Sequence, residues 1–205
     1  MLLCDIGNTT YHFFDEGQSY KKSVENFAPA LIKETVFYIC VNPLLKDSLR
    51  SAENWVDLSL HVDISKYYET MGIDRIMACE AVDNAIVIDA GSAVTVDIVS
   101  NSVFEGGFIY PGIKAMKDAY KNISSMLDYS FNFELDLDKM PKNSADAISY
   151  GYLKTIYSEV MSHDMDIYLT GGDANRFAKI FKNARVDEIL IFKGMKKIMK
   201  KADLC

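Results

Sequence analysis

Two stretches of the sequence decide the fold: LLCDIGNTT (residues 2–10) and AIVIDAGSAV (residues 85–94). Each begins with the apolar residues of a buried strand and continues into Asp-x-Gly followed by a small polar residue. Glycine lets the backbone turn tightly at this point, and β-forming residues then resume. One pattern that opens both halves of a chain indicates duplication of a single α/β unit.

The residues around these stretches predict the same kind of layout in both halves. Three strands in hairpin order come first, and strands alternating with helices follow, which predicts a mixed sheet flanked by helices. The expected strands are residues 2–6, 10–14, a short segment after Gly17, 36–41, 56–60, 85–89, 94–99, 103–109, 167–169 and 188–192. The expected helices are residues 28–34, one opening at Pro43, 64–68, 74–83, 111–121, 144–161 and one after Gly171-Gly172, with a last helix through the basic run at 193–201.

Composition limits the class of function. The chain has 205 residues, a net charge of -7 and a sequence pI near 5.0, which argue against a nucleic-acid binder. No apolar run reaches the roughly 18 residues of a membrane span. Asp5 interrupts any secretory core, and Cys4, Cys40, Cys79 and Cys205 lack metal-ligand spacing, so we expect a cytoplasmic protein with free thiols and no membrane partner.

The two Asp-x-Gly turns suit phosphate chemistry. Backbone amides and hydroxyls after the glycine can donate to phosphate oxygens, and the aspartate offers a hard oxygen to a cation. Either turn alone is also an ordinary β-turn, whereas two of them predict a nucleotide held between two lobes. Gly171-Gly172 would let the backbone approach adenine or ribose, although Gly-Gly is also a common strand-to-helix turn. Neither GxxxxGK[ST] nor GxGxxG occurs.

Five motifs in order carry a specific resemblance: DIGNT (residues 5–9), GIDR (72–75), DAGSAVTVD (89–97), GGFIYPG (106–112) and TGG (170–172). Their order and spacing resemble type III pantothenate kinases over nearly the whole chain. The resemblance implies an α/β protein with a duplicated ribonuclease H-like (actin-like ATPase) fold, in which a nucleotide cleft separates two lobes, residues 1–84 and 85–205. The sequence does not decide whether the last helix stays with the second lobe or packs back on the first.

The activity implied by the resemblance is transfer of the ATP γ-phosphate to the primary hydroxyl of pantothenate. The product is 4'-phosphopantothenate, in the first step of coenzyme A biosynthesis. The resemblance also implies a homodimer that uses ATP with Mg²⁺ and a monovalent cation, K⁺ or NH₄⁺.

The resemblance further assigns site residues. Asp74 matches the catalytic base, Asp89 the monovalent-cation ligand, and Asp5 is a candidate for Mg²⁺. The substrate motif is Gly72, Ile73, Asp74 and Arg75. The ATP-binding candidates are Asp5, Ile6, Gly7, Asn8, Thr9, Thr10, Ser92, Gly171 and Gly172.

The residue types fit these roles, because a carboxylate can accept the proton of an acceptor hydroxyl and a guanidinium suits the carboxylate of pantothenate. The alternative is that Asp74 caps a helix and Arg75 lies at the surface.

Two departures from the family pattern leave alternatives. The family's substrate-contacting Tyr precedes an Asn-Pro or Asp-Pro that this chain lacks, so Tyr67 and Tyr68 are both candidates. Ser144 matches the hydroxyl residue that a partner subunit contributes in the family, and it is otherwise a helix N-cap. The competing functions are another sugar- or acetate-kinase-like phosphotransferase, a non-catalytic regulator of transcription and, more weakly, an actin-like filament protein.

Overall fold

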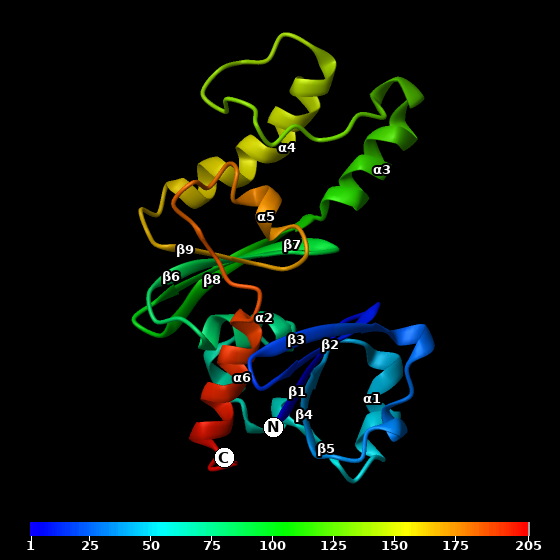
Figure 1. Ribbon diagram of the computed structural model, residues 1–205. Helices are drawn as coiled ribbons and strands as arrows, with labels where there is room; N and C mark the ends of the chain where they lie inside the picture. Colours follow the sequence, from blue (N-terminus) through cyan, green and yellow to red (C-terminus); the bar gives the residue numbers. More distant parts are fainter. Residues whose placement is uncertain (205) are drawn as a thin grey trace. The chain divides into compact units, whose positions relative to one another are not determined.

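The computed structural model describes residues 1–204, and the chain divides into two compact units. Unit 1 combines Met1–Val82 with Ile189–Cys205, and unit 2 is Asp83–Glu188. The last of the four cysteines, Cys205, lies outside the described residues. Each unit contains one five-stranded sheet (Figure 1).

Unit 1 has the strand order β3-β2-β1-β4-β5. The first three strands are antiparallel neighbours, and β4 and β5 join β1 in parallel. The strands are β1 (Leu2–Ile6), β2 (Thr10–Asp15), β3 (Gln18–Ser23), β4 (Val36–Cys40) and β5 (Trp55–Asp57). The α-helices are α1 (Pro43–Arg50), α2 (Ile73–Glu80) and α6 (Leu190–Lys201), and short 3-10 turns are η1 (Val24–Asn26), η2 (Pro29–Leu31), η3 (Leu58–His61) and η4 (Ile64–Lys66).

Unit 2 repeats this topology with the order β8-β7-β6-β9-β10. Again the first three strands are antiparallel, and the last two join in parallel. The strands are β6 (Ala85–Ala90), β7 (Ala93–Ser100), β8 (Val103–Pro111), β9 (Ile167–Thr170) and β10 (Arg185–Val186), and the helices are α3 (Ile113–Ile123), η5 (Ser125–Leu127), α4 (Ser144–Met161) and α5 (Ala174–Phe177). The identical order of strands in the two sheets confirms the predicted duplicated α/β fold.

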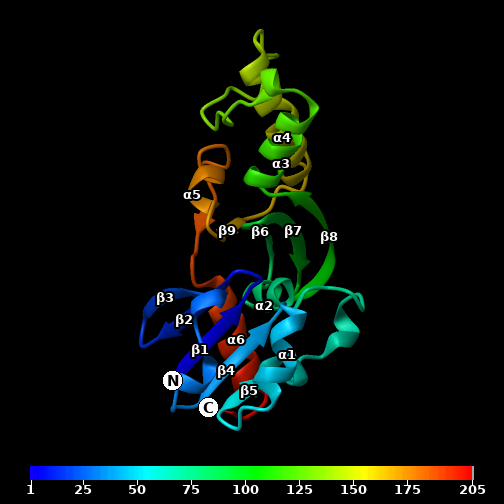
Figure 2. The same ribbon diagram turned by 90° about the vertical axis from the view of Figure 1, so that its right-hand side faces the viewer.

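Each sheet buries an apolar face within its own unit. In unit 1, Leu2, Cys4 and Ile6 of β1 pack with Tyr11, Phe13 and Trp55. In unit 2, residues of β6, β7 and β9 pack against α4 and α5, which cover the same face of the sheet in Figures 1 and 2. Cys4, Cys40 and Cys79 are free and buried, as expected for small apolar side chains.

The segment 188–192 forms a turn and the first residues of α6, which begins at Leu190, rather than the strand that the sequence predicted. Residues 190–192 are apolar and resemble a short strand, but Leu190, Met195, Ile198 and Met199 are buried at helical spacing along α6. α6 packs against α2, where a Cβ on Gly194 would lie 1.8 Å from the carbonyl oxygen of Met77. This contact puts the last helix in unit 1, the option that the sequence left open.

Several smaller predictions are also wrong. The strand expected at 56–60 ends at Asp57 and is followed by η3, and the helix expected at 64–68 is only the 3-10 turn η4. Pro111 does not open a helix, since it ends β8 opposite Ala93, and α3 begins at Ile113. The helix expected at 28–34 is reduced to η2, because Pro29 opens a turn that ends at Leu31.

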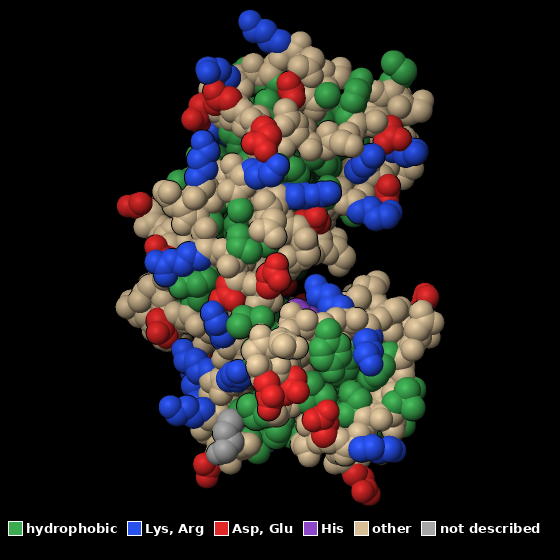
Figure 3. Space-filling view, viewed as in Figure 1, with side chains coloured by type: hydrophobic (Ala, Val, Ile, Leu, Met, Phe, Trp, Pro, Cys, Tyr) green, Lys and Arg blue, Asp and Glu red, His purple; other side chains and the backbone are tan. Residues whose placement is uncertain are grey.

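Charged side chains of both signs are interspersed on the face seen in Figure 3. Within residues 1–204, none of the helices combines the length and the apolar character that crossing a membrane would need.

Candidate active site

The first Asp-x-Gly turn follows β1 in unit 1. Gly7 N donates to the carbonyl oxygen of Thr10 at 3.0 Å, which closes the turn between β1 and β2. Asn8 and Thr9 are exposed at its tip, and Asp5 is partly buried at the end of the strand. Residues at the tip of the turn are thus exposed, and their role as a phosphate loop stays a prediction.

Asn42 supports this turn and was missed by the sequence analysis. Its side chain is 8% exposed, and its Oδ1 accepts from Leu44 N at 3.0 Å as the N-cap of α1. Its Nδ2 donates to the carbonyl oxygen of Asn8 at 3.4 Å. Asn42 thus joins the start of α1 to the tip of the first turn. Asn before Pro43 was a recognisable cap signal, but the link to Asn8 depends on the tertiary structure.

We expect Asn42→Asp to separate these two contacts. Aspartate keeps the capping oxygen but cannot donate to Asn8, so the unfolding free energy should fall by no more than about 1 kcal/mol while the KM for ATP rises several-fold. Asn42→Ala loses both contacts and should cost a further ~1 kcal/mol. Urea unfolding and steady-state kinetics measure the two effects. An unchanged KM in both variants would show that the first turn needs no support from Asn42.

The second Asp-x-Gly turn lies between β6 and β7 in unit 2. Gly91 N donates to the carbonyl oxygen of Ala93 at 2.9 Å, and Ser92 is exposed at the tip. Gly112 N donates to the carbonyl oxygen of Ser92 at 3.1 Å. A Cβ at Gly112 would lie 2.4 Å from the carbonyl oxygens of both Gly91 and Ser92, so only glycine permits this approach. The sequence analysis placed Gly112 in the motif GGFIYPG and in a helix expected at residues 111–121, and it did not predict this approach to the second turn.

The Gly-Gly motif meets the second turn in the same unit. Asp89 pairs with Thr170 across β6 and β9, and Asp173 N donates to the carbonyl oxygen of Ala90 at 2.9 Å. Gly171 has φ +87, and a Cβ there would lie 2.3 Å from Asp89 Oδ1. Two motifs that are distant in the sequence therefore form one loop cluster around the carboxylate of Asp89.

Thr95 is a further residue that the sequence analysis did not select. It stands directly opposite Asp89 in the β6–β7 ladder, so the two side chains share one face of the sheet. Its Oγ1 is buried and has no hydrogen-bond partner among the described residues. Buried polar side-chain atoms usually have a hydrogen-bond partner, and Trp55 Nε1 and His163 Nε2 are further exceptions among the described residues.

The segment GIDR forms the start of α2 in unit 1. Gly72 is the N-cap residue, and Asp74 Oδ1 accepts from Arg75 N at 2.8 Å. Arg75 is only 5% exposed, so the alternative that it lies at the surface is wrong. Its Nη1 donates to Tyr68 Oη, and its guanidinium carbon lies 5.6 Å from the centre of the Tyr68 ring.

Asp74 is not an ordinary surface carboxylate. Burial raises its pKa above the usual value, although the amide of Arg75 and the positive charge of Arg75 act in the opposite direction. A carboxylate with a raised pKa next to a buried guanidinium is a combination found at catalytic sites.

The two candidate tyrosines have different partners. Tyr68 is 43% exposed and contacts Arg75, whereas Tyr67 is partly buried and donates from its hydroxyl to Glu80 Oε1 at 3.1 Å. Ser144 is exposed at the first position of α4 in unit 2. The helix is capped by Asn143, whose Oδ1 accepts from Asp146 N at 2.9 Å, so the alternative that Ser144 is the N-cap is wrong.

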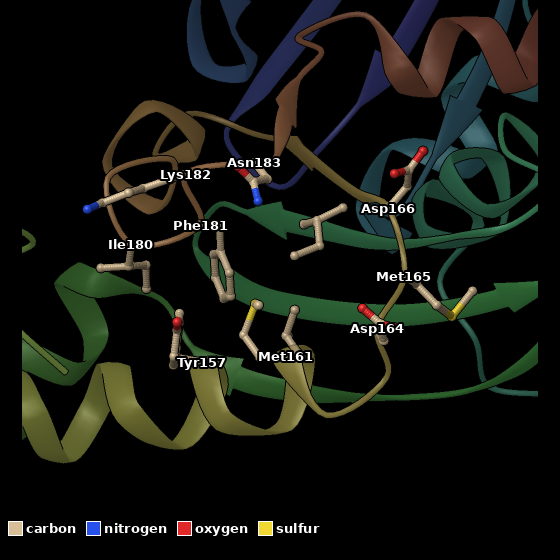
Figure 4. Close-up of a pocket in the computed structure, with 11 residues that line it drawn as sticks. Tyr157, Met161, Asp164, Met165, Asp166, Ile180, Phe181, Lys182 and Asn183 are labelled. Atoms are coloured by element: carbon tan, nitrogen blue, oxygen red, sulfur yellow. The ribbon is translucent and has the colours of Figure 1, made fainter. Parts of the chain in front are cut away.

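Two hollows in unit 2 have comparable volumes. One of about 530 Å³ lies between the end of α4 and the start of β9, and includes Tyr157, Met161 and Phe181 (Figure 4). None of the residues that line it was predicted from the sequence to bind a ligand or to take part in catalysis. The other, of about 520 Å³, includes Asp173 and Arg176 just after the Gly-Gly motif, together with Lys114, Lys117 and Lys179. The second hollow is the better candidate for a ligand site, because it adjoins the predicted Gly-Gly motif.

Comparison with known proteins gives a consistent result. Residues 22–163 match the family model for type III pantothenate kinase. The chain is 69% identical to a type III pantothenate kinase of Sulfurimonas denitrificans over 205 residues, which is 100% of both chains.

Solved structures agree on the fold. A protein of Campylobacter jejuni, described as a Baf family transcriptional activator, is 40% identical with a TM-score of 0.90 over 100% of both chains. A Sinorhizobium meliloti protein described as a 2-dehydro-3-deoxygalactonokinase has a TM-score of 0.56 at 9% identity, covering 98% of this chain and 96% of its own. The second likeness concerns the fold alone.

Proposed function

Because the chain belongs to the type III pantothenate kinase family, we propose that it transfers the γ-phosphoryl group of ATP to the primary hydroxyl of pantothenate. The product is 4'-phosphopantothenate, and the reaction is the first step of coenzyme A biosynthesis. The observation that carries the proposal beyond family membership is the start of α2, where Asp74, with its raised pKa, adjoins the buried Arg75.

Asp74 and Arg75 have complementary roles in this proposal. Arg75 binds the carboxylate of pantothenate through its guanidinium, which matches a carboxylate in shape and charge. Asp74 orients the acceptor hydroxyl and takes its proton as the phosphoryl group is transferred. Its raised pKa brings it nearer to the working pH, which favours a general base. Positioning and charge stabilisation supply most of the catalysis in phosphoryl transfer.

ATP is bound through the two Asp-x-Gly turns and the Gly-Gly motif. Amides and hydroxyls of residues 6–10 and of Ser92 donate to phosphate oxygens, and Gly171-Gly172 lets the backbone approach the adenosine end. The hollow of about 520 Å³ that includes Asp173 lies next to this motif in the sequence, and the basic side chains that line it are each paired with a carboxylate: Lys114, Lys117, Arg176 and Lys179.

Mg²⁺ would be held by Asp5 with the phosphates of ATP and water. Within residues 1–204 no three His, Cys, Asp or Glu side chains are grouped to hold an ion, so the proposal rests on one carboxylate. This suits Mg²⁺, which usually keeps several waters and binds through one or two carboxylates plus phosphates. The ion would neutralise charge on the transferring phosphoryl group.

A monovalent cation, K⁺ or NH₄⁺, would be held by Asp89. The buried hydroxyl of Thr95, directly opposite Asp89 and without a partner among the described residues, fits this assignment as a second oxygen ligand. The cation would supply positive charge beside the second phosphate turn.

Thr95→Val should test the cation site without disturbing the fold. Valine has nearly the same shape but no hydroxyl, so the unfolding free energy should stay the same or rise slightly. The K⁺ concentration for half-maximal activation should increase several-fold. Thr155→Val, on the exposed side of α4, is the matched control and should change neither quantity. Unaltered K⁺ activation in Thr95→Val would exclude its hydroxyl as a ligand.

We further propose a cytoplasmic homodimer in which Ser144 of one subunit helps to close the pantothenate site of the other. Unit 2 exposes large apolar side chains at Ile123, Met126 and Met140, which are 73%, 75% and 76% exposed. Burial of these side chains against a second subunit would stabilise a dimer. The buried free thiols of Cys4, Cys40 and Cys79 suit a reducing compartment.

A non-catalytic regulator of transcription is the alternative suggested by the description of the Campylobacter jejuni structure. It is not favoured, because a scaffold would not need Asp5, Asp74 and Asp89 together. The deciding experiment measures ADP release from ATP by the purified protein with pantothenate, sugars or acetate, with and without K⁺ or NH₄⁺. Turnover that requires pantothenate supports the proposal. ATP binding without pantothenate-dependent turnover would refute it.

A further inference from the structure

Glu80, the last residue of α2, is a buried carboxylate that the proposed reaction does not use. It is 8% exposed and accepts two hydrogen bonds from distant parts of unit 1. Tyr67 Oη donates to Oε1 at 3.1 Å, and Lys201 Nζ of α6 donates to Oε2 at 2.6 Å. A buried carboxylate is costly unless it is paired, so the two donors are needed to keep it there.

Glu80 is deprotonated in this cluster, and Tyr67 and Lys201 keep the protons that they donate to it. Burial raises the pKa of Glu80, but the hydrogen bonds from Lys201 and Tyr67 and the charge of Lys201 outweigh it, so the net shift is downward. Burial and the neighbouring Glu80 raise the pKa of Tyr67, which therefore stays a hydrogen-bond donor. At neutral pH Glu80 is a carboxylate with two donors on it.

This arrangement distinguishes the two neighbouring tyrosines. Tyr67 has extended backbone angles, φ -131 and ψ 163, and consecutive side chains of extended backbone point to opposite sides. Tyr67 is turned toward the C-terminal end of α2 at Glu80, whereas Tyr68 is turned toward the N-terminal end at Arg75. The hydrogen bond from Met71 N to the carbonyl oxygen of Tyr68, at 3.0 Å, then leads the chain into Gly72.

We propose that Glu80 is a positioning residue for pantothenate binding: it holds Tyr67, so that Tyr68 is the tyrosine presented to substrate, and Lys201 makes this arrangement depend on α6. The inference rests on the proposed function. Substrate then meets a pair formed by the ring of Tyr68 and the guanidinium of Arg75, while Tyr67 anchors the segment that carries them. Under this proposal Tyr68, and not Tyr67, is the tyrosine that contacts the substrate.

Lys201→Met and Lys200→Met form a matched pair for the test. Both residues are exposed on α6, but only Lys201 donates to Glu80. Lys201→Met should raise the KM for pantothenate about three- to tenfold, which corresponds to ~0.6–1.4 kcal/mol, because the Lys201 side chain is half exposed and solvent weakens its bond to Glu80. The kcat and the KM for ATP should change less than about twofold. Lys201→Arg should restore the KM, and Lys200→Met should leave all three constants unchanged.

Tyr67→Phe and Tyr68→Phe complete the test. Tyr67→Phe should raise the pantothenate KM as Lys201→Met does, and the double variant should show less than the product of the two single effects because both act through Glu80. Tyr68→Phe should also raise the KM, and its effect should multiply with that of a variant outside this group.

The outcomes separate the inference from the proposed function. A lowered melting temperature with unchanged pantothenate KM in Lys201→Met and Tyr67→Phe would make Glu80 merely structural and overturn the inference, as would an equal rise in KM for Lys200→Met. In both cases the wild-type enzyme still phosphorylates pantothenate. Absence of pantothenate-dependent ADP release in the wild-type protein would instead overturn the proposed function.

Discussion

Asp74→Asn is expected to lower kcat with pantothenate by about 10²–10⁴-fold, the usual contribution of a general base. Asparagine keeps an oxygen for the amide of Arg75, so the start of α2 should remain folded. ATP binding, measured by calorimetry, should be nearly unchanged because only the acceptor hydroxyl loses its partner. Asp47→Asn, an exposed aspartate on α1, is the control and should retain full activity.

The same variant should alter the pH dependence of stability. The folded-state pKa of Asp74 is raised, so the folded protein binds more protons than the unfolded chain between the unfolded and folded pKa values. Wild-type stability therefore declines as the pH rises through that window, and Asp74→Asn removes this contribution. Urea unfolding from pH 4 to 7 should show the variant gaining stability relative to wild type. Equal loss of ATP binding and turnover would contradict the catalytic role and indicate a structural aspartate.

Gly171→Ala is expected to have the largest effect on the fold of unit 2. The new Cβ would lie 2.3 Å from Asp89 Oδ1 and 2.6 Å from the carbonyl oxygen of Ala90, at a backbone φ of +87. Left-handed strain and overpacking each cost ~1–3 kcal/mol, so the unfolding free energy should fall by about 3 kcal/mol. ATP affinity should fall as well, because displacement of Asp89 disturbs the second phosphate turn.

Gly172→Ala is the matched control for stability. No atom lies within 4 Å of a Cβ at this position, so the unfolding free energy should change by less than about 0.5 kcal/mol. Thermal and urea unfolding compare the two variants. Similar stability losses at both positions would mean that the close approach of Gly171 to Asp89 does not constrain the fold.

The sequence predicted the duplicated topology because the decisive signals are local. An apolar strand, Asp-x-Gly and a resumed strand can be recognised within ten residues, and both copies gave the same sheet order. The segment 188–192 could not be assigned locally, because a short apolar run suits a strand or a buried helix equally well. The choice is made by the packing of Gly194 on Met77, residues that are distant in the sequence.

Some residues of the site could likewise be predicted from local motifs, whereas others depend on the tertiary structure. Motifs identified Asp89 and Gly171, but their contact requires the parallel pairing of β6 and β9. Thr95 lies within a regular strand, where threonine is an ordinary β-forming residue. Only its position opposite Asp89 distinguishes it. The different partners of Tyr67 and Tyr68 likewise depend on Glu80, a residue with no motif of its own.

The discontinuity of unit 1 has a consequence for synthesis of the protein. Unit 2 is continuous in the sequence, so it can fold as soon as it leaves the ribosome, whereas unit 1 lacks α6 until the whole of unit 2 has been translated. Until then the apolar surface of α2 around Met77 and Ala78 has no α6 to cover it. The helix that carries Asp74 and Arg75 is therefore completed last, so a nascent chain interrupted before residue 189 would expose this surface to chaperones and proteases.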